Sequence, residues 1–207
     1  MDLSTSHAAV VAVHLQGHIV GPDGAFAGFF YDQVVKTGVL EIIGDLLDAA
    51  RSAGRPVIYT RVAWKPDYSN LHANSPLLQM ARQFGALTEG DPTTDIVAEL
   101  APLSGDVVHT HQRIGGFNAE LDQKLNDRDI DTVLVCGVAT NASVEGTARG
   151  LSDAGYRVVV VEDACSAATS EAHQASIASL GLIGEIVDAA TAVAALKGVP
   201  ADQTVDS

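Results

Sequence analysis

The sequence has little positive charge and very little cysteine. Its 207 residues include 12 lysines and arginines against 26 aspartates and glutamates, which gives a net charge of −14. Nucleic acids and anionic membrane surfaces both attract basic proteins, so this balance argues against either partner. The two cysteines, Cys136 and Cys165, each adjoin an apolar stretch. We expect them to be buried, reduced thiols of a cytoplasmic protein rather than a disulfide.

Long hydrophobic runs are also missing. No apolar run approaches the roughly 20 residues of a membrane-spanning helix, and the segment after Met1 lacks the basic and then apolar pattern of a signal peptide. We therefore expect a cytoplasmic protein without membrane attachment. Because no repeat, linker or low-complexity block interrupts the chain, we predict a single domain over residues 1–207, with a flexible tail from about residue 198.

What the sequence does contain is an alternation of apolar and amphipathic segments. The apolar segments predict strands at residues 8–15, 56–62, 106–111, 132–136, 157–161 and 185–187. The amphipathic segments predict helices at residues 37–53 with Thr37 as N-cap, 76–85, 118–125, 141–154, 171–180 and 189–196. Strands that alternate with helices indicate an α/β domain whose sheet is parallel and whose crossovers are right-handed.

The most informative segment joins the fourth of these strands to the helix that follows it. Residues 137–148 read Gly-Val-Ala-Thr-Asn-Ala-Ser-Val-Glu-Gly-Thr-Ala, a strand–turn–helix junction. The first backbone N–H groups of a helix have no partner within the helix, so they point at whatever lies in front of the sheet. Ser143 stands at this helix start.

Four segments in register resemble the isochorismatase-like (cysteine hydrolase) superfamily. They are residues 14–16 after the first strand, residues 106–117, the junction at residues 137–148, and residues 158–164. The resemblance spans most of the chain. It implies a three-layer α/β/α fold with a six-stranded, mainly parallel sheet of order 3-2-1-4-5-6, and it implies a homo-oligomer without a cofactor.

All three catalytic positions of that family are occupied by other residue types in this chain. The family uses an aspartate, a lysine and a cysteine, and the matching positions hold His14, His111 and Ser143. The resemblance also implies an oxyanion hole formed by the backbone at Ala139 and Ser143, with the peptide before Ala139 often in the cis form. This backbone contribution does not depend on which nucleophile attacks.

The three replacements are chemically compatible with one another. Serine is a weak nucleophile that needs an adjacent base, and imidazole titrates near neutrality. The family's aspartate and lysine sum to zero charge, as do two neutral histidines, so the exchange leaves no unpaired charge in a buried site. The alternative to catalysis is a purely structural role for these residues. In that case Ser143 caps the helix, and His14 and His111 fill space at the strand ends.

Six further residues are predicted to contact a substrate. Aromatic side chains after the second strand would form the wall of an apolar pocket or pack at an interface, and side-chain amides would orient a carbonyl group. An arginine would bind an anion, or else a surface carboxylate. These predicted substrate-binding residues are Gln16, Trp64, Tyr68, Arg113, Phe117 and Asn141.

A metal site is the competing explanation for the histidines. His109 and His111 lie two residues apart and share one face of their strand, and a parallel sheet would bring His14 to the same edge. However, no acidic residue completes a recognisable ligand spacing, so we expect no metal. Whether His14, His109 and His111 bind a metal stays open at this point.

Three functions are compatible with these residues. The first is a hydrolase that acts on a small amide, ester or related carbonyl compound through Ser143, His111 and His14. The second is vinyl-ether hydrolysis of the isochorismatase type by acid catalysis, in which a histidine replaces the missing aspartate. The third is a catalytically silent binding or scaffold protein. The substrate would be a small molecule in either enzymatic case.

Overall fold

The sheet has six parallel strands in the order β3-β2-β1-β4-β5-β6, as predicted. The computed structural model describes residue 3 and residues 7–198, so the predicted flexible tail lies almost entirely outside the described residues. The strands are β1 (Ala8–Val13), β2 (Val57–Val62), β3 (Val107–His111), β4 (Thr132–Val138), β5 (Arg157–Ser166) and β6 (Glu185–Val187).

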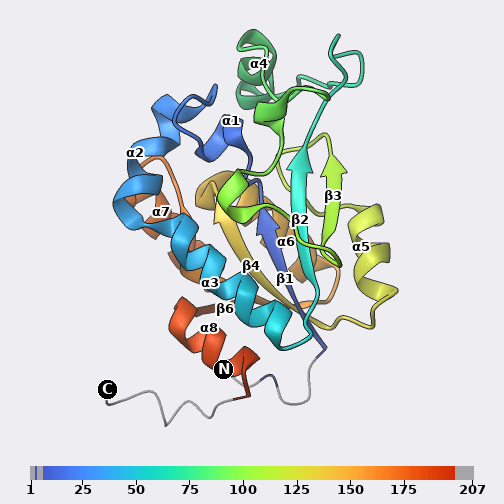
Figure 1. Cartoon of the computed structure of the whole chain (residues 1–207), viewed down its shortest axis with the longest axis vertical. Coiled ribbons are helices and arrows are strands. Elements are labelled where there is room, and N and C mark those ends of the chain that lie inside the picture. The colour runs from blue at the N-terminus through green and yellow to red at the C-terminus, as the bar shows by residue number, and fades with distance from the viewer. Residues whose placement is uncertain (1–2, 4–6, 199–207) are drawn as a thin grey trace.

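Helices cover both faces of this sheet. In Figure 1, α3 and α8 lie in front of the strands, and α6 and α7 lie behind them. In chain order the helices are α1 (Gly17–Val20), α2 (Ala27–Thr37), α3 (Val39–Ser52), α4 (Pro76–Gln83), α5 (Ala119–Asn126), α6 (Glu145–Asp153), α7 (Ser170–Leu180) and α8 (Ala189–Leu196). None of the described helices is long and apolar enough to cross a membrane.

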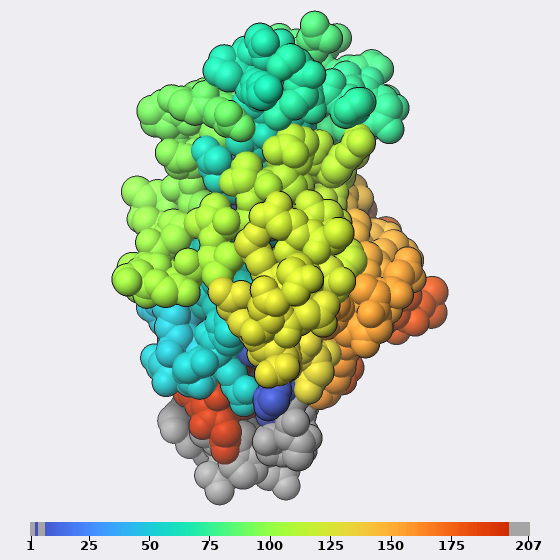
Figure 2. Space-filling view, turned by 90° about the vertical axis from the view of Figure 1, so that its right-hand side faces the viewer, coloured from blue at the N-terminus to red at the C-terminus, as the bar shows by residue number. Residues whose placement is uncertain are grey.

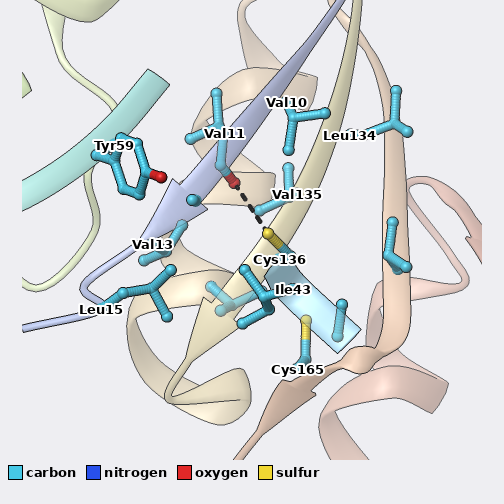
Figure 3. Close-up of a cluster of buried hydrophobic side chains, with 14 of the residues drawn as sticks. Val10, Val11, Val13, Leu15, Ile43, Tyr59, Leu134, Val135, Cys136 and Cys165 are labelled. Carbon is cyan, nitrogen blue, oxygen red and sulfur yellow. Dashed lines mark hydrogen bonds between the residues drawn. The ribbon is translucent and has the colours of Figure 1, made fainter. Parts of the chain in front are cut away.

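The core is centred on the two middle strands. Every residue of β1 and β4 is buried, which is usual for parallel strands covered on both faces. Figure 3 shows both cysteines in this apolar cluster, where the Cys136 thiol donates a long hydrogen bond to the Val11 carbonyl at 3.9 Å. Cys136 and Cys165 are buried and unbridged, as the sequence predicted. Burial raises the pKa of Cys136 to about 12.

The largest differences from the predicted elements concern the start of α3, the segment before it and the end of β5. Thr37 is not an N-cap: it ends α2, and its hydroxyl donates to the Gln33 carbonyl at 2.8 Å. Instead, Gly38 precedes α3 and takes a left-handed conformation with φ of +64°. The sequence analysis did not predict α1 or α2, and β5 extends to Ser166 rather than to residue 161.

The carboxyl ends of the strands define the edge where a site is expected. The arrows of β1, β2, β3 and β4 in Figure 1 point toward α1 and α4, and Figure 2 shows the α4 region projecting above the body of the molecule, with α5 below it. Open α/β sheets bind ligands at this edge. The residues that follow β1, β3 and β4 therefore face the same space.

Candidate active site

His14 and His111 are in direct contact at this edge. His14 follows β1 and has a φ of +53°, while His111 is the last residue of β3. Since β2 lies between these two strands, the two side chains meet across its end. Their Nε2 atoms are 2.9 Å apart, and the rings are stacked with centroids 5.0 Å apart. The fold thus brings together two residues that are 97 positions apart in the sequence.

A backbone contact indicates which nitrogens carry protons. The Arg113 N–H donates to His111 Nδ1 at 3.3 Å, so that nitrogen holds a lone pair. A neutral His111 then has its proton on Nε2 and donates it to His14 Nε2. His14 must carry its own proton on Nδ1, a nitrogen that has no hydrogen-bond partner among the described residues. In the resting state, His14 therefore has a free N–H group.

Both imidazoles are neutral at neutral pH. His14 and His111 are each 2% exposed. Burial, and then the neighbouring His111, hold the pKa of His14 well below the ordinary value. Burial, and then His109, lower the pKa of His111 to about 3. Removing a cation from water without a carboxylate partner favours the uncharged form, and this explains both directions.

A third imidazole extends the pair into the protein. The fully buried ring of His109 stacks on His111 with centroids 5.6 Å apart and an angle of 13° between the planes. Its Nδ1 is 3.7 Å from a carboxylate oxygen of Glu120, and neither ring nitrogen has a hydrogen bond. His109 thus stacks on the ring of His111, which in turn contacts His14 through its Nε2 atom. Within residues 7–198 no group of three or more His, Cys, Asp or Glu side chains is placed to hold a metal ion.

Ser143 lies on the turn between β4 and α6. Residues Thr140–Val144 form one π-helical turn, and the peptide between Val138 and Ala139 is cis. Gly137 has a φ of +125°, and a Cβ atom there would lie 2.2 Å from the Val13 carbonyl oxygen. Only glycine allows β4 to approach β1 this closely at the entrance to the turn. This contact fixes the turn relative to the strand that carries His14.

Thr147 connects the Ser143 turn to the loop that carries Arg113. The Thr147 hydroxyl donates to the Ser143 carbonyl at 2.6 Å and accepts from the Gly116 N–H at 2.8 Å. Gly116 is itself pressed against Thr60 of β2, since a Cβ atom would lie 2.6 Å from the Thr60 methyl group. One buried hydroxyl thus couples two of the segments that surround the site.

His14 and Ser143 line the same small cavity. Its volume is about 60 Å³, which is space for about five water molecules. Apolar side chains form most of the wall, and Ala139 is also part of it. His111 is not among the lining residues, so it lies behind His14. Ser143 is 8% exposed, and its hydroxyl has no hydrogen bond to a described residue.

Two of the six predicted substrate-binding residues line this cavity, namely Trp64 and Arg113. The Trp64 side chain is 1% exposed, and its indole N–H has no acceptor among the described residues. Tyr68 is adjacent but contributes indirectly: its ring packs against Trp64 at 6.3 Å, and its hydroxyl donates to the Ala86 carbonyl at 2.8 Å. Tyr68 therefore supports the wall without forming it.

The other three residues predicted to bind a substrate do not line this cavity. The Gln16 amide is fully engaged, because its nitrogen donates to the carbonyls of Val62 and Thr94 and its oxygen accepts the Val62 N–H. Gln16 thus joins the chain after β1 to the end of β2. Asn141 is exposed and lies outside the cavity lining. The third residue, Phe117, packs edge-on against Tyr156 and does not line the cavity.

Part of the cavity wall comes from helices that the sequence analysis missed. Ile19 of α1 and Phe30 of α2 line it, together with Phe26, which immediately precedes α2. The only signal in the sequence was the cluster of aromatic residues in the segment 25–31. The stacking of His109 on His111 was not predicted either. The two-residue spacing along a strand shows that the side chains share a face, but it does not show that their rings stack.

The sequence and the fold match those of known proteins. The isochorismatase domain profile matches residues 8–191. The chain belongs to the isochorismatase family. It is 32% identical to the uncharacterised isochorismatase family protein YecD of Escherichia coli O157:H7, over 86% of this chain and 89% of that protein.

Two other relatives carry functional names. The chain is 34% identical to the ureidoacrylate amidohydrolase RutB of Methylobacterium radiotolerans, over 92% of this chain and 80% of that protein. The crystal structure of a cysteine hydrolase from Pseudomonas syringae pv. phaseolicola superposes with a TM-score of 0.84 at 27% identity, and covers 93% of both chains.

Proposed function

We propose that this isochorismatase-family protein hydrolyses a small amide, ester or related carbonyl compound, with Ser143 as the nucleophile. The observation that carries the proposal is that Ser143 and His14 line one apolar cavity while His14 is held by His111 at 2.9 Å. Relatives named as amidohydrolases act on a C–N bond, which favours an amide. The predicted homo-oligomer and cytoplasmic location are part of this proposal.

In this mechanism His14 is the base, and His111 orients it. The Ser143 hydroxyl attacks the carbonyl carbon and transfers its proton to His14, which later returns a proton to the departing amine or alcohol. Water then hydrolyses the acyl-serine ester by the same route. Because His111 lies behind His14, it holds the ring in place and shares the added proton.

The base role requires the second neutral tautomer of the pair. His14 must present a lone pair on Nδ1, so its proton moves to Nε2 and faces His111, whose own proton moves to Nδ1. This change gives up the 3.3 Å hydrogen bond from the Arg113 N–H, which is worth about 1 kcal/mol.

The backbone beside Ser143 would stabilise the tetrahedral intermediate. Both Ala139 and Ser143 line the cavity, and the π-helical turn lies at the start of α6. A backbone N–H aimed at the developing oxyanion contributes about 3 kcal/mol in acyl-transfer enzymes. We assign this role to the N–H groups of Ala139 and Ser143.

The acid-catalysed alternative is less well supported. Protonation of a vinyl ether needs an imidazolium, and burial keeps the pKa values of His14 and His111 far below neutrality. The charged form is therefore rare at pH 7, whereas the neutral base is always present. A catalytically silent scaffold would explain the fold equally well. Only the detection of substrate turnover distinguishes it from a hydrolase.

A screen of small amides and esters tests the proposal. We expect turnover by the wild type, a loss of at least 100-fold in kcat for Ser143→Ala, and an acyl adduct on Ser143 detected by mass spectrometry. Ser152→Ala is the matched control, since Ser152 lies on α6 and donates to the Ile183 carbonyl away from the cavity. Full activity of Ser143→Ala would exclude the acyl-serine mechanism.

A further inference from the structure

Arg113 is an arginine at the cavity without a carboxylate partner. Its side chain lines the cavity and the residue is exposed, which places it at the mouth. Among the described residues no carboxylate lies within 4.0 Å of its guanidinium, although acidic side chains far outnumber basic ones. By contrast, Arg51, Arg61 and Arg149 each form an ion pair.

Two further polar side chains of the wall have unpaired N–H groups, and the Ser143 hydroxyl can donate or accept. The Trp64 indole N–H is buried and has no acceptor in the described part of the chain. His14 has a free N–H in the tautomer that the Arg113 backbone favours. No aspartate or glutamate lines the cavity. Buried donors are almost always satisfied in native proteins, so the ligand of this cavity must supply acceptor atoms.

We propose that the substrate is a small carboxylic acid amide or ester whose free carboxylate binds Arg113 at the cavity mouth. This assignment rests on the proposed function, and it adds the charge of the substrate. The carboxylate would form a charge-assisted hydrogen bond with the guanidinium, and the reacting carbonyl would face His14 and Ser143. The part between them would be short and apolar, because the wall there is apolar and the cavity is about 60 Å³.

The charge of the whole protein makes a local cation necessary for such a substrate. A net charge of −14 does not attract anions from solution. Recognition must therefore come from a positive group at the site itself, within the roughly 8 Å over which exposed charges act at physiological salt. Arg113 is held in place by its own backbone, since its N–H is bonded to His111. The guanidinium thus starts from a fixed point beside the catalytic pair.

Binding can be measured without turnover, because Trp64 is the single tryptophan and it lines the cavity. Butyrate and butanamide are nearly isosteric probes that differ in charge, and each is titrated while Trp64 fluorescence is followed. We expect butyrate to bind the wild type and Arg113→Gln to weaken its Kd by about 10- to 100-fold. Butanamide should bind both proteins equally weakly. Arg82→Gln should match the wild type, since Arg82 is exposed on α4 outside the cavity lining.

The proposal is overturned if butanamide binds as tightly as butyrate, if Arg113→Gln keeps the wild-type affinity for butyrate, or if neither probe binds. Ser143→Ala separates this proposal from the proposed function. If Ser143→Ala binds butyrate like the wild type while no amide or ester is hydrolysed by either protein, the carboxylate site stands and the hydrolase proposal fails. Hydrolysis of neutral amides in preference to carboxylate-bearing ones would leave the hydrolase proposal standing and refute the role of Arg113.

Discussion

Two buried imidazoles, those of His14 and His111, are in direct contact at the strand ends. His14 and His111 share a hydrogen bond between Nε2 atoms, and burial keeps both uncharged. A single charged residue at either position would be buried without a partner, which is strongly destabilising. The two positions are therefore coupled, and a test of one histidine must consider the other.

The first residue-scale prediction concerns Ser143 and His14. If they act as one unit, Ser143→Ala and His14→Ala should each lower kcat by at least 100-fold, and the double variant should be little worse than either. Kinetics of the three variants with one substrate measure this. Losses that multiply in the double variant would show that the two residues act independently.

A second prediction follows from the pKa directions. The base must be neutral to accept the serine proton, and burial moves the titration of the pair well below the ordinary histidine range. The acid limb of kcat/KM should therefore lie below about pH 5 rather than near 6.5. A limb near 6.5 would show that the reactive base is not this buried pair. Because the rings are in contact, the limb belongs to both of them.

Cysteine chemistry gives a third prediction. Burial raises the pKa values of Cys136 and Cys165, so neither is a reactive thiolate. Iodoacetamide should leave wild-type activity unchanged, whereas Ser143→Cys should create one labelled thiol at residue 143, detected by mass spectrometry. Inactivation of the wild type by the reagent, with label on either native cysteine, would contradict this assignment.

The alignment of the sequence motifs predicted that His14 and His111 lie together at the site. It could not predict what the neighbouring residues do. The pattern placed His14 and His111 at matching positions, and the structure brings them into contact. Gln16 is also in register, but all of its amide hydrogen bonds go to backbone groups. Spacing along a chain does not show which polar side chains are consumed by the fold and which remain available to a ligand.

At the level of elements, the junction between β4 and α6 positions Ser143. A Cβ atom at Gly137 would lie 2.2 Å from the Val13 carbonyl oxygen, so Gly137→Ala must separate β4 from β1. We expect this variant to lose about 2–5 kcal/mol of stability in urea unfolding. Gly28→Ala is the control, because a Cβ atom there meets nothing within 4 Å and alanine favours the helix. Equal stability of the two variants would contradict this account of the junction.

Strand order and most helices could be predicted because their patterns are regular. Parallel strands buried on both faces appear as continuous apolar runs, and the family resemblance supplied their order. The segment that forms α2 reads Ala-Gly-Phe-Phe-Tyr-Asp-Gln-Val-Val-Lys-Thr. Its glycine, aromatic and β-branched residues have low helix propensity, and it is packing beside the cavity that stabilises the helix. This helix was missed for that reason.

For the whole molecule, the predicted homo-oligomer is tested most directly by light scattering. Phe29 and Phe84 are 46% and 48% exposed, and both pack against Phe26 near the cavity. We expect an assembly larger than one chain at micromolar concentration, weakened by Phe84→Ser. A monomeric wild type would contradict the prediction. An unchanged assembly in Phe84→Ser would place the interface elsewhere on the molecule.

The buried histidines should also make the stability of the whole protein sensitive to acid. In the unfolded chain histidine titrates near 6.5, whereas in the folded protein the pKa of His111 is lowered to about 3. Between these values the unfolded state binds more protons, so the free energy of unfolding falls as the pH falls. The contribution of His111 to the free energy of unfolding is present above pH 6.5 and is lost at about 1.4 kcal/mol per pH unit below it.

Urea unfolding at pH 7 and pH 5 measures this acid loss, which is the decrease in the free energy of unfolding between the two pH values. The acid loss should be smaller for His111→Gln than for the wild type. His72→Gln should keep the wild-type loss, because His72 lies exposed in the loop before α4. An acid loss that is equal in all three proteins would show that His111 gains its proton without unfolding, and the neutral pair proposed for catalysis would then be wrong.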